Sequence, residues 1–214
     1  MKEFGGWQFP SHETHLINWM AKHNVLAEGR LTYQYEKLQL ALAHTPERRV
    51  AIDVGAHIGL MSYYLARQFE RVEAFEPLPA HRDCFLRNVK SENVILHGCA
   101  LGSKPGRARM VTYRGNSGHS HIADIGEIEV AICTLDEFEF DRVDLFKIDC
   151  EGYELQVLEG ATKTLNRCTP TVLVEQKPGN GTRYGYGDRA ALEFLQDLGA
   201  RQVAAVSGDY VFVW

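Results

Sequence analysis

The run Val50-Ala51-Ile52-Asp53-Val54-Gly55-Ala56-His57-Ile58-Gly59 decides the fold of this 214-residue chain. Its first half is apolar and β-branched apart from one aspartate, which predicts a buried strand. Its second half is a glycine turn, and the amphipathic stretch from about Ile58 to Phe69 then predicts a helix. A buried strand, a turn and a helix in this order form the first unit of an α/β fold.

The same alternation continues along the chain. Further strands are predicted at Arg71 to Phe75, Asn93 to Gly98, Val143 to Ile148 and Thr171 to Glu175. One helix is predicted at Pro79 to Lys90 and another between the last two of these strands. A further helix is predicted after Asp188, which is expected to be its N-cap, and ends at Gly199. Residues 202–206 and 210–214 predict a C-terminal antiparallel hairpin, and residues 107–134 an insertion of two strands around a loop. We therefore expect an α/β fold with a mostly parallel sheet.

The chain before Val50 has a helical pattern. Leu16, Ile17 and Met20 form one apolar patch, and apolar residues recur at helical spacing from Leu31 to Leu42. This pattern predicts two helices ahead of the main fold. We therefore divide the chain into an N-terminal helical extension, residues 1–45, and a main domain, residues 46–214.

Composition limits the partners and the compartment. Lys and Arg total 23 against 28 Asp and Glu, a net charge of -5, which disfavours nucleic acid as a partner because phosphate neutralisation needs clustered cations. The five cysteines are odd in number and form no C-x-x-C pair, which is typical of reduced thiols. No stretch reaches the roughly 18 apolar residues of a membrane span. We therefore expect a soluble, cytoplasmic protein with no membrane span.

In an open parallel sheet, ligands bind at the carboxyl ends of the strands. The segments that follow the predicted strands are therefore the candidates for the site: Asp53 to Gly59, Glu76, Cys99 to Leu101, Asp149 to Glu154, and Glu175 to Gln176.

The glycine turn favours a nucleoside cofactor without phosphates. A dinucleotide fingerprint would need Gly at the position of His57, which weakens the hypothesis of an NAD-dependent oxidoreductase, and no P-loop is present. Asp53 would repel a pyrophosphate but attract an ammonium group, as S-adenosylmethionine carries. Gly55 and Gly59 would let the backbone approach such a ligand. Glu76, at the end of the second strand, could accept hydrogen bonds from ribose hydroxyls.

The chain also resembles the FkbM-type methyltransferases between about Val50 and Lys177. The resemblance rests on Ala51 to Gly59, Phe75-Glu76-Pro77, Cys99-Ala100-Leu101-Gly102, Gly115-Asn116-Ser117-Gly118, and the run Lys147-Ile148-Asp149-Cys150-Glu151-Gly152-Tyr153-Glu154 with Leu158-Glu159-Gly160-Ala161. It implies a class I, Rossmann-like methyltransferase that uses S-adenosylmethionine to methylate hydroxyls of sugars or secondary-metabolite scaffolds. On the matching positions, the cofactor-binding residues would be Asp53, Gly55, His57, Gly59, Glu76, Pro77, Cys99, Ala100, Leu101, Ser117, Asp149 and Glu151. The family often has Asn where this chain has His57, which leaves the role of that residue open.

Methyl transfer to a hydroxyl is helped by a positioned base. The candidates are Asp149, Glu175, His119 and His121, of which Asp149 has the best expected position and the histidines the best ordinary pKa. Asp149 could instead join Glu175 and Gln176 in binding a divalent cation, although we expect no metal. Residues 115–122, rich in Gly and Ser, are expected to form a mobile loop over a small-molecule or glycan acceptor. The alternative function is a methyltransferase-like module that binds the cofactor without turnover.

Overall fold

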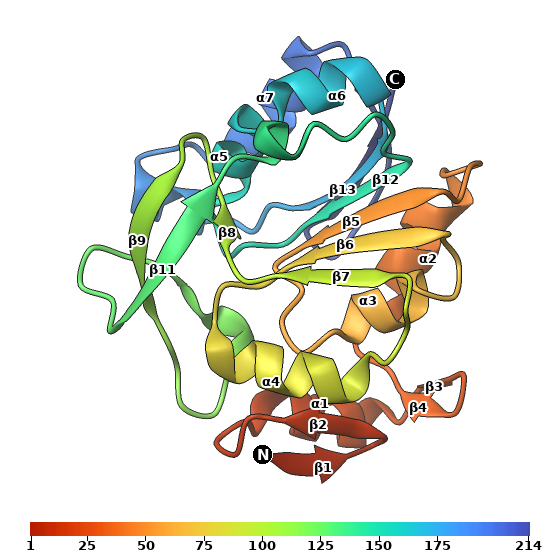
Figure 1. The fold of residues 1–214 in the computed structure, drawn as a ribbon, viewed down its shortest axis with the longest axis vertical. Helices are drawn as coiled ribbons and strands as arrows, with labels where there is room; N and C mark the ends of the chain where they lie inside the picture. The colour runs from red at the N-terminus through yellow and green to blue at the C-terminus, as the bar shows by residue number, and fades with distance from the viewer.

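The structure, a computed structural model, describes residues 1–214 and is built around a seven-stranded sheet (Figure 1). The strand order is β14-β15-β13-β12-β5-β6-β7. The bounds are β5 (Val50–Val54), β6 (Arg71–Phe75), β7 (Val94–His97), β12 (Leu145–Ile148), β13 (Thr171–Glu175), β14 (Arg201–Val206) and β15 (Asp209–Val213). Strands β5, β6, β7, β12 and β13 pair in parallel, whereas β15 runs antiparallel to β13 and β14. The predicted mostly parallel sheet with a C-terminal hairpin is therefore confirmed.

Helices cover both faces of this sheet, and each face has its own hydrophobic core (Figure 1). One face carries α1 (His15–His23), α2 (Tyr35–Ala43), α3 (Leu60–Leu65) and α4 (Pro79–Asn88). The other carries α5 (Glu154–Glu159), α6 (Thr162–Cys168) and α7 (Ala190–Asp197). Parallel strands buried on both sides are predominantly apolar, although β5, β6 and β12 each bury one charged residue, Asp53, Glu73 and Lys147.

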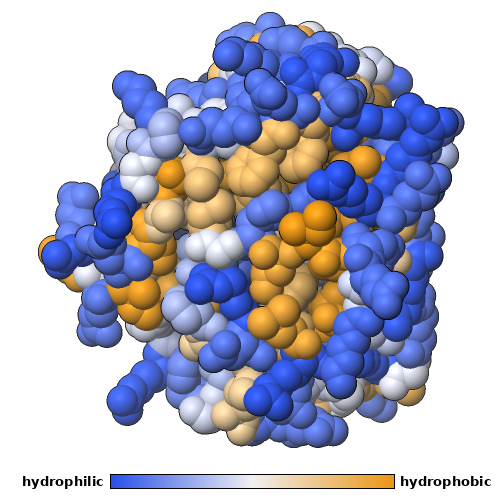
Figure 2. Space-filling view, viewed as in Figure 1, coloured by the Kyte–Doolittle hydropathy of each residue, from blue (hydrophilic) through white to orange (hydrophobic).

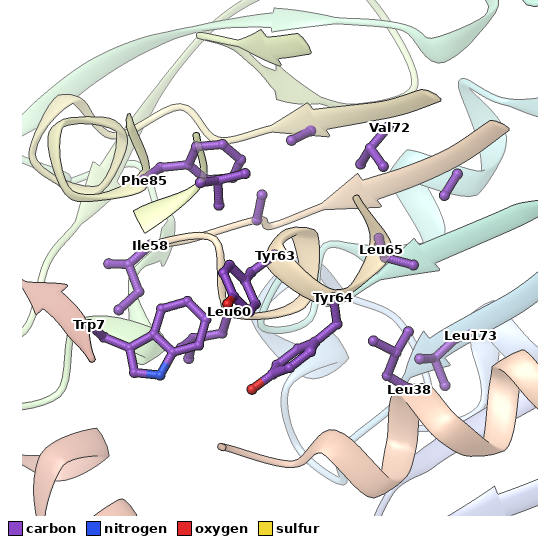
Figure 3. Close-up of a cluster of buried hydrophobic side chains, with 14 of the residues drawn as sticks. Trp7, Leu38, Ile58, Leu60, Tyr63, Tyr64, Leu65, Val72, Phe85 and Leu173 are labelled. Atoms are coloured by element: carbon purple, nitrogen blue, oxygen red, sulfur yellow. The ribbon is translucent and has the colours of Figure 1, made fainter. Parts of the chain in front are cut away.

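The N-terminal segment contains both predicted helices, α1 and α2, but also two hairpins that the helical pattern did not predict. These pair β1 (Lys2–Phe4) with β2 (Trp7–Phe9), and β3 (Leu26–Ala27) with β4 (Arg30–Leu31). Strands of two or three residues are too short to give an alternating pattern. Trp7 is fully buried, and its indole ring packs edge to face against the phenol ring of Tyr63, with the ring centroids 5.1 Å apart (Figure 3). The segment therefore shares the core of the main fold.

Two further details differ from the expectation. The single helix predicted between the fourth and fifth strands is divided into α5 and α6. A Cβ on Gly160, at this division, would lie 2.0 Å from the carbonyl oxygen of Gly102. Asp188 does not cap α7, whose N-cap is Arg189; its carboxylate instead accepts the backbone N–H of Gly179 at 2.7 Å.

A smaller sheet lies beside the carboxyl ends of the parallel strands (Figure 1). It contains β8 (Ala100–Leu101), β9 (Gly106–Val111), β10 (His121–Ile122) and β11 (Ile128–Cys133), so the predicted insertion supplies its two long strands. Short 3-10 helices occupy Ser117–His119, Leu135–Phe138 and Gly181–Tyr184. All five cysteines are unpaired thiols, as their number and spacing predicted.

Figure 2 shows apolar surface on the side of the molecule formed by β7 and α4. Among the exposed large apolar side chains are Ile95 on β7 and Leu86 on α4. No helix in the structure combines the length and the apolar composition that crossing a membrane would require.

Candidate active site

A pocket opens at the carboxyl ends of β5 and β6, where ligands bind in open parallel sheets. Most residues expected to bind a cofactor line it: Gly55, His57, Glu76, Pro77, Ala100, Leu101, Ser117, Asp149 and Glu151. This first pocket therefore brings together five separate stretches of the sequence.

The sequence did not identify the apolar walls of the first pocket. Phe75, Leu78, Met110, Ile122 and Tyr153 line it. Their positions next to the strand-end motifs were a usable signal, but apolar side chains in a core-forming pattern look the same whether they face a ligand or another side chain.

Glu76 is a buried carboxylate of the first pocket. One of its oxygens accepts the backbone N–H of His57 at 2.9 Å, and the other accepts that of Leu78 at 2.8 Å. The Nδ1 atom of His81 lies 3.2 Å from the second oxygen. Three donors thus fix the carboxylate, while the residue still faces the pocket.

Asp53 lies behind the glycine turn and lines neither this pocket nor the one that adjoins it. Its Oδ1 pairs with the Nζ of Lys147 at 2.9 Å, and its Oδ2 accepts the hydroxyl of Ser62 at 2.6 Å. Burial alone would lower the pKa of Lys147, but the Asp53 carboxylate raises it above its ordinary value. The ammonium group that Asp53 meets in this structure is therefore that of Lys147.

The two glycines of the turn have different neighbours. Gly55 has a φ of +72°, and a Cβ there would lie 1.9 Å from the carbonyl oxygen of Asp149, so any side chain would force β5 and β12 apart at the pocket. Gly59 does not line the first pocket; a Cβ there would lie 2.6 Å from Val89. Cys99 is buried outside the pocket as well. Gly59 and Cys99 are therefore packing positions in this structure.

A second pocket adjoins the first and is far more polar. It shares Gly55, His57, Gly118, Asp149 and Glu151 with the first pocket. Its other charged and polar residues are His15, Tyr33, Gln34, Asn116, His119, Lys147, Glu175 and Lys177. Three of these, His15, Tyr33 and Gln34, come from the N-terminal segment, which carried no recognisable motif.

The carboxylates of the second pocket are distinguished by their pKa values. Burial raises the pKa of Glu175 to about 9, and the nearby Asp149 adds to the effect, although Lys177 opposes both. Burial also acts to raise the pKa of Asp149, but Lys147, Lys177 and Lys37 hold it below its ordinary value. At neutral pH, Asp149 is therefore the ionised member of the pair and Glu175 the protonated one.

Behind these two carboxylates lies a buried cation that the sequence did not identify. Lys37, on α2, forms a salt bridge with Asp209 on β15 and lies 3.9 Å from Glu175. Lys37 is only 2% exposed. The pKa of Asp209 rises to about 6 through burial, against the opposing effect of Lys37. A lysine within a helical pattern gave no sign that it would face a sheet rather than water.

The structure separates the two histidines that were candidates for the base. His119 lines the second pocket, and its pKa is lowered by burial and then by Lys177. His121 lines the first pocket, where its ring stacks on Tyr113 and its Nδ1 lies 3.0 Å from the carbonyl oxygen of His119. Only His119 is therefore in the same pocket as Glu175.

Carboxylate oxygens of Asp149, Glu151 and Glu175 lie within 4.8 Å of one another. Asp149 and Glu175 therefore lie close together, as a shared divalent cation would require. Gln176, the third expected ligand, instead accepts the N–H of Ala191 at 3.0 Å. Lys177 lies 2.6 Å from Glu175 and 4.0 Å from Glu151, so an ammonium group already lies against two members of this cluster.

Glu151 and Glu154 follow Asp149 but have separate roles. Glu154 is 1% exposed, and its Oε1 accepts the backbone N–H groups of Cys150 and Gly152, each at 2.9 Å. Glu151, which lines both pockets, accepts the side-chain amide of Asn180 at 3.2 Å. Glu154 is therefore a structural cap, and Glu151 is the one that faces the site.

Similar proteins are methyltransferases or share their fold. Methyltransferase 1 of Beauveria bassiana (strain ARSEF 2860) is 27% identical over 151 residues, which cover 56% of this chain and 61% of that protein, so the chain spans about three fifths of that relative. The crystal structure of methyltransferase FkbM from Methylobacillus flagellatus KT is 19% identical, with a TM-score of 0.52 over 78% of this chain and 44% of that one. A Streptococcus mutans protein, crystallised with S-adenosylhomocysteine (SAH), is 13% identical, with a TM-score of 0.53 over 85% of this chain and 96% of that one.

The two solved structures establish the fold, a class I methyltransferase fold of the Rossmann-like kind, and the site lies where that fold binds ligands, at the carboxyl ends of the strands. The model of the methyltransferase FkbM domain matches residues 53–201, from the buried aspartate of β5 to the start of β14. The chain therefore belongs to the FkbM methyltransferase family.

Proposed function

We propose that this protein transfers the methyl group of S-adenosylmethionine to a hydroxyl of a sugar or secondary-metabolite acceptor. The observation that carries the proposal is the pair of adjoining pockets that share Gly55, His57, Gly118, Asp149 and Glu151. Methyl transfer from a sulfonium is an in-line displacement, so cofactor and acceptor need separate sites that meet at the reacting carbon. The geometry supports this arrangement.

The first pocket fits the cofactor. Apolar walls suit an adenine ring, and the fixed carboxylate of Glu76 suits the two hydroxyls of a ribose. The close approach of Gly55 to β12 leaves backbone, rather than a side chain, beside the ligand. The Streptococcus mutans protein of the same fold was crystallised with SAH, which supports this cofactor class. When bound, S-adenosylmethionine would supply an electrophilic methyl group.

The second pocket would hold the acceptor, and Asp149 would act as the base. Because its pKa is held below the ordinary value, Asp149 is ionised at neutral pH and can accept the proton of an acceptor hydroxyl as the new bond forms. Glu175 carries a proton at that pH, so it can donate a hydrogen bond but cannot serve as the base. His119, which is neutral, is the second candidate.

Calorimetry with SAH and with NADH tests the cofactor. We expect binding of SAH and none of NADH; the reverse result would contradict the proposal. Native mass spectrometry of the purified protein adds a check for a cofactor that co-purifies.

A methyl-transfer assay with labelled S-adenosylmethionine, run over a panel of glycan and small-molecule hydroxyl acceptors, tests the reaction. We expect labelled product that persists in a chelator, because Asp149 replaces a metal. Loss of activity in chelator with recovery in Mg²⁺ would refute the metal-free reaction. SAH binding without labelled product on any acceptor would favour the binding module.

A further inference from the structure

Glu13 is a buried carboxylate of the N-terminal segment, outside residues 53–201 that define the family. Its Oε1 accepts the backbone N–H of Leu16 at 2.8 Å. Its Oε2 accepts the backbone N–H of Ser117 at 2.6 Å and also the hydroxyl of Ser117. A carboxylate is costly to bury unless donors satisfy it, and here two of the three donors belong to one distant loop.

The backbone joins the same two segments. The N–H groups of Thr14 and His15 both donate to the carbonyl oxygen of Gly115, at 3.1 and 2.7 Å, and the hydroxyl of Thr14 donates to it at 3.0 Å. His15 and Leu16 line the second pocket, whereas Ser117 lines the first. The Gly- and Ser-rich loop that was expected to be mobile is therefore anchored by polar contacts to the N-terminal segment.

Ser117 connects Glu13 to the glycine turn, because its hydroxyl contacts both Glu13 and His57. Its hydroxyl has one proton, which goes to Glu13, so its oxygen accepts from the Nε2–H of His57 at 2.9 Å. Burial, followed by His81 and Lys147, lowers the pKa of His57 well below its ordinary value. His57 is thus a neutral imidazole with its proton on Nε2, a tautomer assigned from this hydrogen-bond network.

His57 completes the connection to the carboxylate of the first pocket. It has a left-handed backbone, with a φ of 52°, which is uncommon for a residue with a side chain. In this conformation its N–H donates to Glu76 while its ring reaches Ser117. One continuous series of hydrogen bonds therefore runs from Glu13 through Ser117 and His57 to Glu76.

We propose that Glu13 is a positioning residue that holds the 115–120 loop over the first pocket and, through Ser117, orients His57 and Glu76 for the cofactor. This inference rests on the proposed function, in which the first pocket binds S-adenosylmethionine. It places a determinant of cofactor affinity on the N-terminal segment. It also gives His57 a role, because Glu13 would fix the orientation of the His57 imidazole through Ser117.

Hydrogen exchange of the full chain without ligand tests the anchorage. The variant Glu13→Gln keeps the size of the side chain but replaces one acceptor oxygen with an amide nitrogen. We expect amides of residues 115–120 to exchange at least ~10-fold faster, since loss of these bonds lowers the free energy of local opening. The control Glu3→Gln changes an exposed glutamate of the same segment and should leave that loop unchanged. Equal exchange in wild type and Glu13→Gln overturns the inference.

Calorimetry with SAH, at a temperature well below the unfolding midpoint, tests whether Glu13 affects cofactor binding or only stabilises the loop. We expect Glu13→Gln to raise Kd about tenfold, as for a lost hydrogen bond to a charged group, and Glu3→Gln to leave it unchanged. A looser loop with unchanged Kd overturns the positioning role. A wild-type chain that does not bind SAH overturns the proposed function instead, so the two failures can be told apart.

The variant Ser117→Ala removes the loop's side of the same contact and replaces Glu13→Gln as the test if Glu13→Gln does not fold. It removes the hydroxyl between Glu13 and His57, and we expect a similar rise in Kd. The double variant should bind SAH no more than about twofold worse than Ser117→Ala, because both changes break one series of contacts. Fully additive losses would show that Glu13 does not act through Ser117 and would overturn the inference.

Discussion

The two pockets of the site share one boundary but differ in how they are built. The first has apolar walls and, apart from the shared Asp149 and Glu151, one carboxylate, Glu76, that backbone N–H groups hold in place. The second has buried carboxylates and ammonium groups that set one another's ionisation. The first pocket suits recognition of one fixed ligand, whereas the second can hold and move a proton.

The boundary itself depends on an ion pair between Asp53, which lines neither pocket, and Lys147, which lines the second. Lys147 binds Asp53 and also donates to the carbonyl oxygens of Val54 and Gly55, each at 3.1 Å. It therefore holds the turn that separates the pockets. Four substitutions test how far the functions of the two pockets can be separated.

Lys147→Met should have the largest effect, and on both pockets together. It leaves the carboxylate of Asp53 buried without its cation, which typically costs about 3–5 kcal/mol of unfolding free energy. Urea unfolding measures the change, and Lys104→Met, at an exposed lysine, is the control. A loss below about 1 kcal/mol would mean that the pair does not hold the turn.

Asp149→Asn should affect turnover alone. It keeps the shape of the side chain but removes the base, so we expect turnover to fall at least ~10² fold with SAH affinity nearly unchanged. The labelled methyl-transfer assay and calorimetry measure the two quantities. Asp141→Asn, at an exposed aspartate, should retain full turnover. If Asp149→Asn is also fully active, His119 becomes the leading candidate for the base.

Glu76→Ala should affect the first pocket alone. Each lost charge-assisted hydrogen bond to the ligand is worth about 1.5–3 kcal/mol, so Kd for SAH should rise by about ten- to a hundredfold per bond. Glu70→Ala, at an exposed position just before β6, is the matched control for calorimetry. Unchanged affinity in a folded Glu76→Ala protein would exclude Glu76 from cofactor binding.

Glu175→Gln should show its effect in the pH dependence of stability. The pKa of Glu175 rises from 4.5 to about 9 on folding, so between these pH values the folded protein keeps a proton that the unfolded chain releases. The contribution of this group to unfolding free energy is therefore present below about pH 4.5 and decreases as pH rises toward 9.

Urea unfolding across this range tests the sign. Stability of Glu175→Gln relative to wild type should increase with pH, because Gln does not titrate. The exposed Glu193→Gln variant should show no such trend. Parallel curves for wild type and Glu175→Gln would contradict the raised pKa.

The strands and the cofactor motif were predictable for a common physical reason. Strands β5, β6 and β13 match their predicted bounds because strands buried on both faces are short runs rich in apolar and β-branched residues. The segments that follow them meet at one edge because parallel strands end together, so Gly55, Glu76 and Asp149 could be placed in one site before any coordinates.

What the sequence by itself determined is thus the parallel sheet, the position of the site at its carboxyl edge and the resemblance to a methyltransferase family. Tertiary structure alone decided which carboxylates face a ligand: Asp53 pairs with Lys147, Glu154 caps a backbone turn, and Glu76, Asp149 and Glu151 line the pockets. It also decided that Glu13, Tyr33 and Lys37 from the N-terminal segment complete the site. The periodic spacing of apolar residues indicates which segments form buried strands and helices. Ion pairs and hydrogen bonds between distant segments leave no such periodic pattern in the sequence.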